Sequence, residues 1–220
     1  MHSFLEVKNN QQILNFINQT EKALFALGYT DHGLRHSNIV ADRAMSIAKK
    51  IGLSERDIEL AGVAGFCHDM GNFMTRTYHH YFGALLFHQV FQNDFAPEEM
   101  TNIMQAISNH DKDEMDFVNK VSAVLVLADK SDVHRSRVLV DDIKKIKSDI
   151  HDRVNYAVTE SSLTLDTKTK RVTLKLTIDT NFTPIMEYFE IFTERMSYCR
   201  TAAEYLGYQF GIIINKTRLL

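Results

Sequence analysis

The segment GVAGFCHDMGN, residues 62–72, ends an apolar run with an adjacent imidazole and carboxylate, His68 and Asp69. Burying such a pair costs several kcal/mol unless a partner compensates for the lost solvation. The pair therefore lies either at a solvated helix end or beside a cation that it holds. Other histidine and aspartate residues along the chain bear on this choice.

Further candidate ligands lie at the ends or on the inner faces of apolar segments. His32 and His36 are four residues apart, so they share one side of a helix. His79 and His80 lie about 100° apart around a helix, so one of them at most can point inward. The remaining candidates are His110, Asp129 and Asp132. Imidazole and carboxylate ligands together suit Zn²⁺, Mn²⁺, iron and similar ions.

Helices must position most of these side chains. Apolar residues recur near a 3.6-residue period over residues 11–27 and 36–51, and each run stops at a glycine, Gly28 or Gly52. Pro97 suits the first turn of a later helix. The segment 118–132 is apolar nearly all round, which predicts a buried helix that carries Asp129.

The pattern changes near residue 158. Apolar and polar residues then alternate over SSLTLDTKTKRVTLKLTID, which predicts a β-hairpin with one buried face. A long helix from about residue 184 to 206 and a third strand follow. We therefore predict a mainly α fold with a helical domain at residues 1–158. A small C-terminal α+β appendage at residues 159–220 would consist of the antiparallel hairpin and the long helix.

The overall composition excludes several classes of protein. The 220 residues include 45% hydrophobic and 24% charged residues, which is typical of soluble globular domains. A formal charge of −3 argues against an extended nucleic-acid surface or a membrane surface as partner. The two distant cysteines, Cys67 and Cys199, fit a reducing compartment, and Cys67 is interpreted as a core thiol. Since no signal peptide or apolar run of about 20 residues is seen, we expect a cytoplasmic protein.

The order His36, then His68–Asp69, then Asp129 resembles the H…HD…D signature of the HD superfamily of metal-dependent phosphohydrolases. The resemblance covers about residues 30–135, including the flanks RHSNIVADRAMSIAKKIGL, AGFCHDMGN and LADKSD. It implies an HD-type helical bundle and hydrolysis of phosphoester bonds, often in nucleotides. The signature residues would hold one metal ion, and Asp69 would bridge to a second ion held by His79 and His110.

The resemblance also implies one or two divalent or iron-group ions, chosen from Mn, Fe, Zn, Ni, Co and Mg. Such an ion lowers the pKa of bound water, so that hydroxide becomes available near neutral pH. His68 and Asp69 would thereby belong to the catalytic machinery.

One position departs from the family pattern. Many members read HD-x-G-K, and here Asn72 stands in place of the lysine. Arg76, one turn downstream, is the candidate cation for catalysis and for binding the substrate phosphate, and Arg135 is the next candidate. The other candidate substrate-binding residues are His32, His80, Asn72 and Asp132.

Three functions compete. The leading hypothesis is a metal-dependent phosphohydrolase that cleaves a phosphomonoester or phosphodiester, with a nucleotide or another small phosphorylated molecule as substrate. The GYP-type signature that the family uses for cleaving cyclic dinucleotides is not present after His110, where the chain reads NHDKDEMDF. Cyclic di-GMP is therefore disfavoured as a substrate. The second hypothesis is a di-iron HD-type oxygenase. The third is a non-catalytic, metal-stabilised module for nucleotide sensing or assembly, and the edge of the predicted sheet would allow a homodimer.

Overall fold

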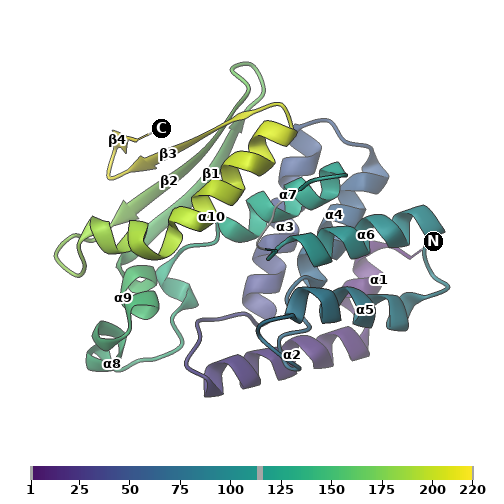
Figure 1. Ribbon diagram of the computed structural model, residues 1–220, viewed down its shortest axis with the longest axis horizontal. Coiled ribbons are helices and arrows are strands. Elements are labelled where there is room, and N and C mark those ends of the chain that lie inside the picture. The colour runs from purple at the N-terminus through teal and green to yellow at the C-terminus, as the bar shows by residue number, and fades with distance from the viewer. Residues whose placement is uncertain (1, 113–115, 220) are drawn as a thin grey trace. The chain divides into compact units, whose positions relative to one another are not determined.

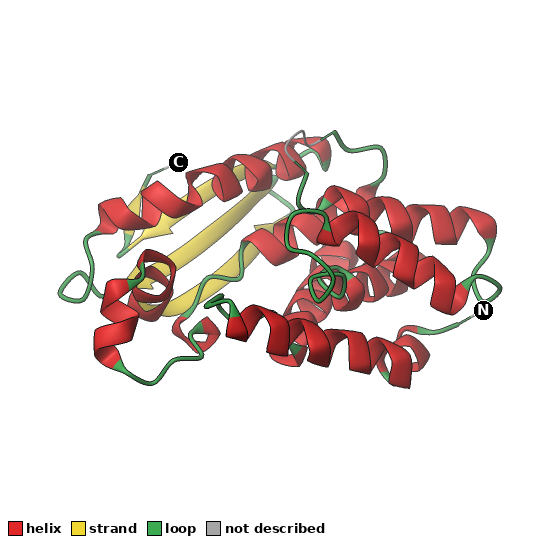
Figure 2. Ribbon diagram, turned by 60° about the horizontal axis from the view of Figure 1, so that its bottom comes forward, coloured by secondary structure: helices red, strands yellow, loops and turns green. Residues whose placement is uncertain are grey.

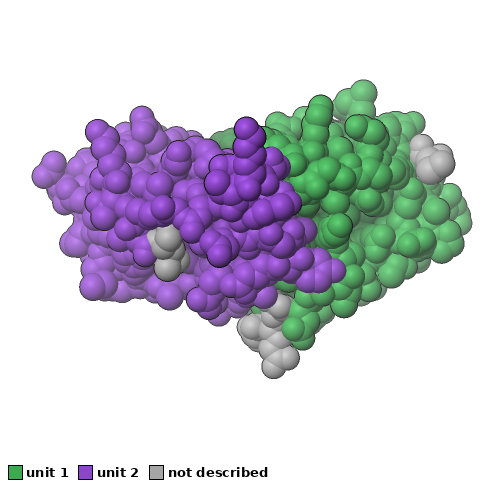
Figure 3. All heavy atoms as spheres, turned by 90° about the horizontal axis from the view of Figure 1, so that it is seen from above, with its two compact units in different colours: residues 1–129 green, residues 130–220 purple. Residues whose placement is uncertain are grey.

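The computed structural model describes residues 2–112 and 116–219, which form two compact units, residues 1–129 and 130–220 (Figure 3). The first unit is helical, and the second combines short helices and one long helix with a sheet. The predicted mainly α fold with a C-terminal α+β part is thus confirmed. The compact units divide after residue 129, and within the second unit the helix of residues 150–157 contacts the strand that follows it. The domain boundary at residue 158 stays a prediction.

The first unit contains the elements expected from the 3.6-residue periodicity (Figure 1). Asn10 and Ser54 cap two helix starts with their side chains, and Gly28 and Gly52 adopt positive φ just after two helix ends. The helices are α1 (Phe4–Lys8), α2 (Gln11–Ala26), α3 (Leu34–Lys50), α4 (Glu55–Cys67), α5 (His79–Phe91), α6 (Pro97–Asn109) and α7 (Lys120–Lys130).

The core of this unit surrounds α4 and α7. Residues 60–72 are all buried, and so are residues 121–129 on α7, as the all-round apolar pattern predicts. Helices α3 and α4 approach closely at Gly65, where a Cβ atom would lie 2.9 Å from the Cα of Ala41. This close packing carries the His68 end of α4 toward the first turn of α3.

The second unit is built on a four-stranded sheet with the order β1-β2-β3-β4. Its elements are η1 (Arg135–Arg137), α8 (Ile143–Ser148), α9 (Ile150–Ala157), β1 (Val158–Asp166), β2 (Arg171–Ile178), α10 (Ile185–Tyr205), β3 (Gln209–Ile214) and β4 (Thr217–Arg218). Strands β1 and β2 form the predicted antiparallel hairpin. Strand β3 pairs with β2 in parallel, and α10 makes the crossover and lies along one face of the sheet (Figure 2).

The alternation of apolar and polar residues along the strands matches the burial of their side chains. Val172, Leu174, Leu176 and Ile178 are all buried on β2, whereas the residues between them are half-buried or exposed. None of the helices formed by the described residues is long and apolar enough to cross a membrane.

Candidate metal centre

Five helices of the first unit, or the turns that end them, bring the predicted ligand residues together. His36 lies in the first turn of α3, His79 is the first residue of α5, and Asp129 is near the end of α7. His68 and Asp69 follow the C-terminal end of α4, and His110 follows that of α6. All the ligand candidates are buried: His36, His68, Asp69, His79, His110 and Asp129.

Four of these side chains form a first set. The Nε2 atom of His36 lies 3.3 Å from Nε2 of His68, 3.3 Å from Oδ1 of Asp129 and 3.6 Å from Oδ2 of Asp69. The Nε2 atom of His68 lies 3.2 Å from the same Asp69 oxygen and 3.6 Å from the Asp129 oxygen. Tetrahedral ligands at about 2.0–2.2 Å from one ion are about 3.3–3.6 Å apart. The spacing therefore fits a shared cation.

The other Asp69 oxygen belongs to a second set. Its Oδ1 atom lies 3.3 Å from Nε2 of His79 and 3.6 Å from Nε2 of His110. The two imidazole nitrogens are 3.1 Å apart. The two carboxylate oxygens of Asp69 thus face different sets of candidate ligands, and this orientation would let one carboxylate serve two ions.

Three ligand rings are oriented by the same backbone contact. The Nδ1 atom of each ring faces the carbonyl oxygen three residues earlier: His68 to Gly65 at 2.8 Å, His79 to Arg76 at 2.8 Å, and His110 to Ile107 at 2.6 Å. Because a carbonyl oxygen can only accept, each ring donates from Nδ1. The neutral ring then presents the lone pair of Nε2 to the centre, as a metal ligand requires.

His68 and Asp69 stabilise opposite charges on one another. Burial disfavours the His68 imidazolium, but the charge of Asp69, together with Asp129, outweighs burial and raises the pKa of His68 to about 10. Burial of Asp69 acts against its charge, but His68 and the other ring donors hold the pKa of the carboxyl well below its ordinary value. An ion bound at Nε2 of His68 would take the place of the proton that this imidazolium carries. Burial alone raises the pKa of Cys67, so that thiol stays protonated in the core.

Asn72 contacts the bridging carboxylate directly. Its Nδ2 atom donates to Oδ1 of Asp69 at 2.9 Å and to the backbone carbonyl of Asp69 at 2.9 Å. Its Oδ1 atom accepts a hydrogen bond of 2.9 Å from Arg76. The residue in the place of the family's lysine is therefore a link between the guanidinium of Arg76 and Asp69.

Asp111 is a residue of this site that sequence reasoning missed. Its Oδ2 atom lies 3.7 Å from Nε2 of His79 and 3.7 Å from the guanidinium of Arg76. Its position directly after His110 repeats the His-Asp adjacency of residues 68 and 69. That repetition was the available signal, but spacing alone does not show that this carboxylate turns toward the centre.

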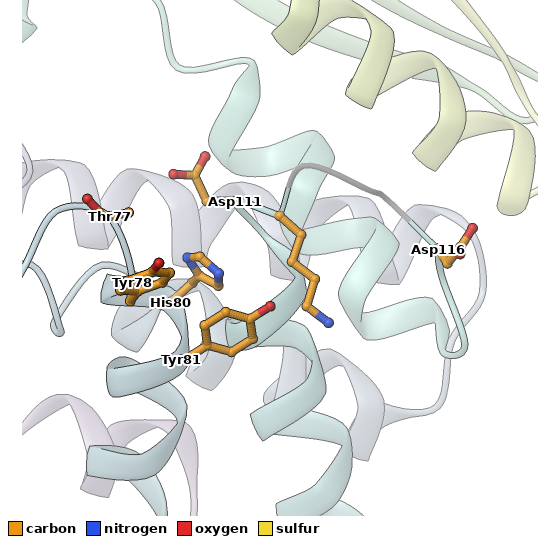
Figure 4. Close-up of a pocket in the computed structure, with 7 residues that line it drawn as sticks. Thr77, Tyr78, His80, Tyr81, Asp111 and Asp116 are labelled. Carbon is orange, nitrogen blue, oxygen red and sulfur yellow. The ribbon is translucent and has the colours of Figure 1, made fainter.

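A cavity of about 520 Å³ lies beside the second set of ligands. Figure 4 shows His80 among its lining residues, which are Thr77, Tyr78, His80, Tyr81, Asp111, Lys112 and Asp116. Burial and the neighbouring imidazoles lower the pKa of His80 to about 4, so this ring is neutral at physiological pH. Among the described residues its Nδ1 atom has no hydrogen-bond partner.

The other predicted substrate-binding residues are placed differently. His32 is buried with its ring centroid 5.7 Å from that of His36, and its Nδ1 atom contacts the carbonyl of Thr30. Asp132 and Arg135 belong to the second unit. The backbone carbonyl of Asp132 accepts from Arg137 at 2.9 Å, and the guanidinium of Arg135 lies 5.1 Å from the ring of Tyr156. The roles of these residues in binding substrate stay predictions.

Comparison with known proteins places the ligand residues within a known family. The family model described as "HD domain" matches residues 33–153, a range that includes both sets of ligands. A curated relative, "Uncharacterized protein MJ1020" of Methanocaldococcus jannaschii, is 26% identical over 169 residues, which cover 66% of this chain and 64% of the relative. The chain thus spans slightly less than two thirds of the length of that relative. On the family match, which extends over more than half of the sequence, the chain belongs to the HD domain family.

Proposed function

We propose that this protein is a metal-dependent phosphohydrolase that acts on a small phosphorylated molecule, with a nucleotide as the expected class. One observation carries the proposal. Buried imidazoles and carboxylates form two ligand sets that share Asp69, and a cavity large enough for a small molecule lies beside them. The family supports this chemistry, since the HD superfamily is one of metal-dependent phosphohydrolases.

The donor set fits divalent cations, and such ions would supply Lewis acidity and a hydroxide nucleophile near neutral pH. The backbone contacts of His68, His79 and His110 keep their Nε2 atoms directed to the centre. Asn72 fixes the plane of the Asp69 carboxylate. The partly exposed guanidinium of Arg76 is a cation that a phosphate oxygen can reach at the edge of the site.

Elemental analysis of the purified protein, followed by a phosphatase and phosphodiesterase panel with the metal found, tests this proposal. We expect bound Mn, Fe, Zn, Ni, Co or Mg and release of phosphate or nucleoside from at least one substrate. Asp69→Ala should lose both metal and activity, because Asp69 contributes an oxygen to each set. Asp42→Asn, which changes an exposed carboxylate on α3, is the matched control and should keep both.

Three results would contradict the proposal. Unchanged metal content in Asp69→Ala would show that the ligand sets hold no ion. Iron with an oxygen-dependent spectral change, but no phosphate release, would favour a di-iron oxygenase. A nucleotide that raises the melting temperature and is never turned over would favour a non-catalytic module.

A further inference from the structure

A second hollow lies between α5 and α6 and has a different chemical character from the cavity at the metal ligands. Its volume is about 440 Å³. Tyr81, Ala84 and Leu85 of α5 form one wall, and Met104 with neighbouring neutral polar side chains of α6 forms the other. Leu85 is 59% exposed and Tyr81 is 45% exposed. We refer to this hollow as the α5–α6 groove.

The groove adjoins the cavity at Tyr81, which lines both. The cavity carries the charged residues Asp111, Lys112 and Asp116 and reaches the ligand His79 through Asp111. The groove has no charged residue in its lining. The charged residues of the cavity are two carboxylates and one ammonium, so an anionic end of a ligand would depend on Arg76 and on the bound ions. The neutral lining of the groove suits an apolar end of the same ligand.

The length of the apolar strip argues for a short occupant. Exposed polar residues lie beyond the groove on both helices. His88 follows Leu85 by one turn on α5, and Glu98 precedes Thr101 by one turn on α6. The strip therefore covers about two helical turns before polar side chains end it. A docked helix uses apolar anchors spread over i, i+3, i+4 and i+7 and needs a longer surface. An alkyl or aryl group of a small molecule fits within these limits.

We propose that the α5–α6 groove binds the apolar substituent of a phosphoester whose phosphate lies at the metal ligands. This assignment rests on the proposed phosphohydrolase function. Among the small phosphorylated molecules proposed there, it favours a phosphoester with an apolar substituent over a nucleotide. Removing the exposed surface of Leu85 and Tyr81 from water would provide the binding free energy for the apolar end.

A series of n-alkyl phosphonates, from methyl through butyl and hexyl to octyl, tests the groove without turnover, because hydrolases of phosphoesters do not cleave the P–C bond. Isothermal titration of the metal-loaded protein gives the Kd of each. Complete burial of a methylene is worth about 0.8 kcal/mol, or about fourfold in Kd. For a half-open groove we expect about twofold per methylene, which is about 100-fold from methyl to octyl.

Leu85→Glu should abolish the gain with chain length and leave the Kd of methyl phosphonate unchanged. Leu27→Glu changes a leucine that is 69% exposed just after α2, and this matched control should keep the gain. A Kd independent of chain length, an equal gain in Leu85→Glu, or no binding of any phosphonate would overturn the inference. Self-association in sedimentation that Leu85→Glu abolishes would assign the groove to a second copy of the chain instead.

Phosphate release from short esters separates this inference from the proposed function. If the Kd of the phosphonates depends on chain length but no ester is hydrolysed, the groove is supported as a ligand site and the hydrolase function is contradicted. If short esters are hydrolysed but the Kd of the phosphonates does not depend on chain length, the hydrolase function is supported and the role of the groove is contradicted.

Discussion

At the scale of single residues, the candidate centre depends on how the Asp69 carboxylate is turned. Its Oδ2 atom faces His36 and His68, and its Oδ1 atom faces His79 and His110. If the carboxylate rotated, at least one of its oxygens would turn away from the ligand set that it now faces. The amide of Asn72 opposes that rotation, because it donates to Oδ1 and to the backbone of the same residue.

We predict that Asn72→Ala weakens the binding of the ion held by the second set and spares the first. Loss of a hydrogen-bonding partner of a ligand typically costs about 10–100-fold in metal affinity. Competitive metal titration of the purified variant measures both affinities. Asn93→Ala, a change of an exposed asparagine after α5, is the control and should match the wild type. Equal affinities in Asn72→Ala and the wild type would show that Asp69 needs no such support.

At the scale of elements, the second set exists because α5 packs directly against the turn that follows α4. A Cβ atom on Gly71 would lie 2.2 Å from the carbonyl oxygen of His79 and 2.6 Å from the amide nitrogen of Gly83. Glycine is required here by this contact between two backbones. The glycine of the HD-x-G segment therefore sets how closely His79 approaches Asp69.

We predict that Gly71→Ala displaces α5, which lowers both stability and affinity for the second ion. Overpacking of this kind costs about 1–3 kcal/mol in the free energy of unfolding. Chemical denaturation of the metal-free protein and metal titration check the two effects. Gly62→Ala is the control, because its Cβ would meet the flexible end of Met45 at 2.7 Å, which can move aside. Wild-type metal affinity in Gly71→Ala would show that the contact does not position the second set.

At the scale of the whole molecule, the ligands join helices that are far apart in the sequence. His36 and Asp129, 3.3 Å apart at their ligand atoms, belong to α3 and α7. An ion at this point contacts the native arrangement and not the unfolded chain, so it stabilises the fold by mass action. Without an ion, the paired charges of His68 and Asp69 stay in the interior.

We predict that removing the metal with a chelator lowers the melting temperature. Free metal at 100 times its Kd contributes about 2.7 kcal/mol. In a chain of this size that corresponds to about 5–10 °C. Differential scanning calorimetry of the loaded and stripped protein measures the shift. The melting temperature of Asp69→Ala should be the same with metal and with chelator. A wild-type protein whose melting temperature does not change with the chelator would refute a metal site in the native fold.

The sequence by itself determined the residue types of the centre and most of the elements. The adjacency of His68 and Asp69, the glycines that end helices and the alternation along β2 are local properties, and local properties can be read along a chain. The HD family membership followed from the same residues and is confirmed by the family match.

Only the tertiary structure decided which side chains meet and how they are oriented. It placed Asp111 beside His79, made Asn72 a link to Asp69, and paired β3 with β2 in parallel. Each of these features depends on distances between segments that are separated in the sequence. Periodicity reports which face of a segment is buried, but not the partner against which that face packs.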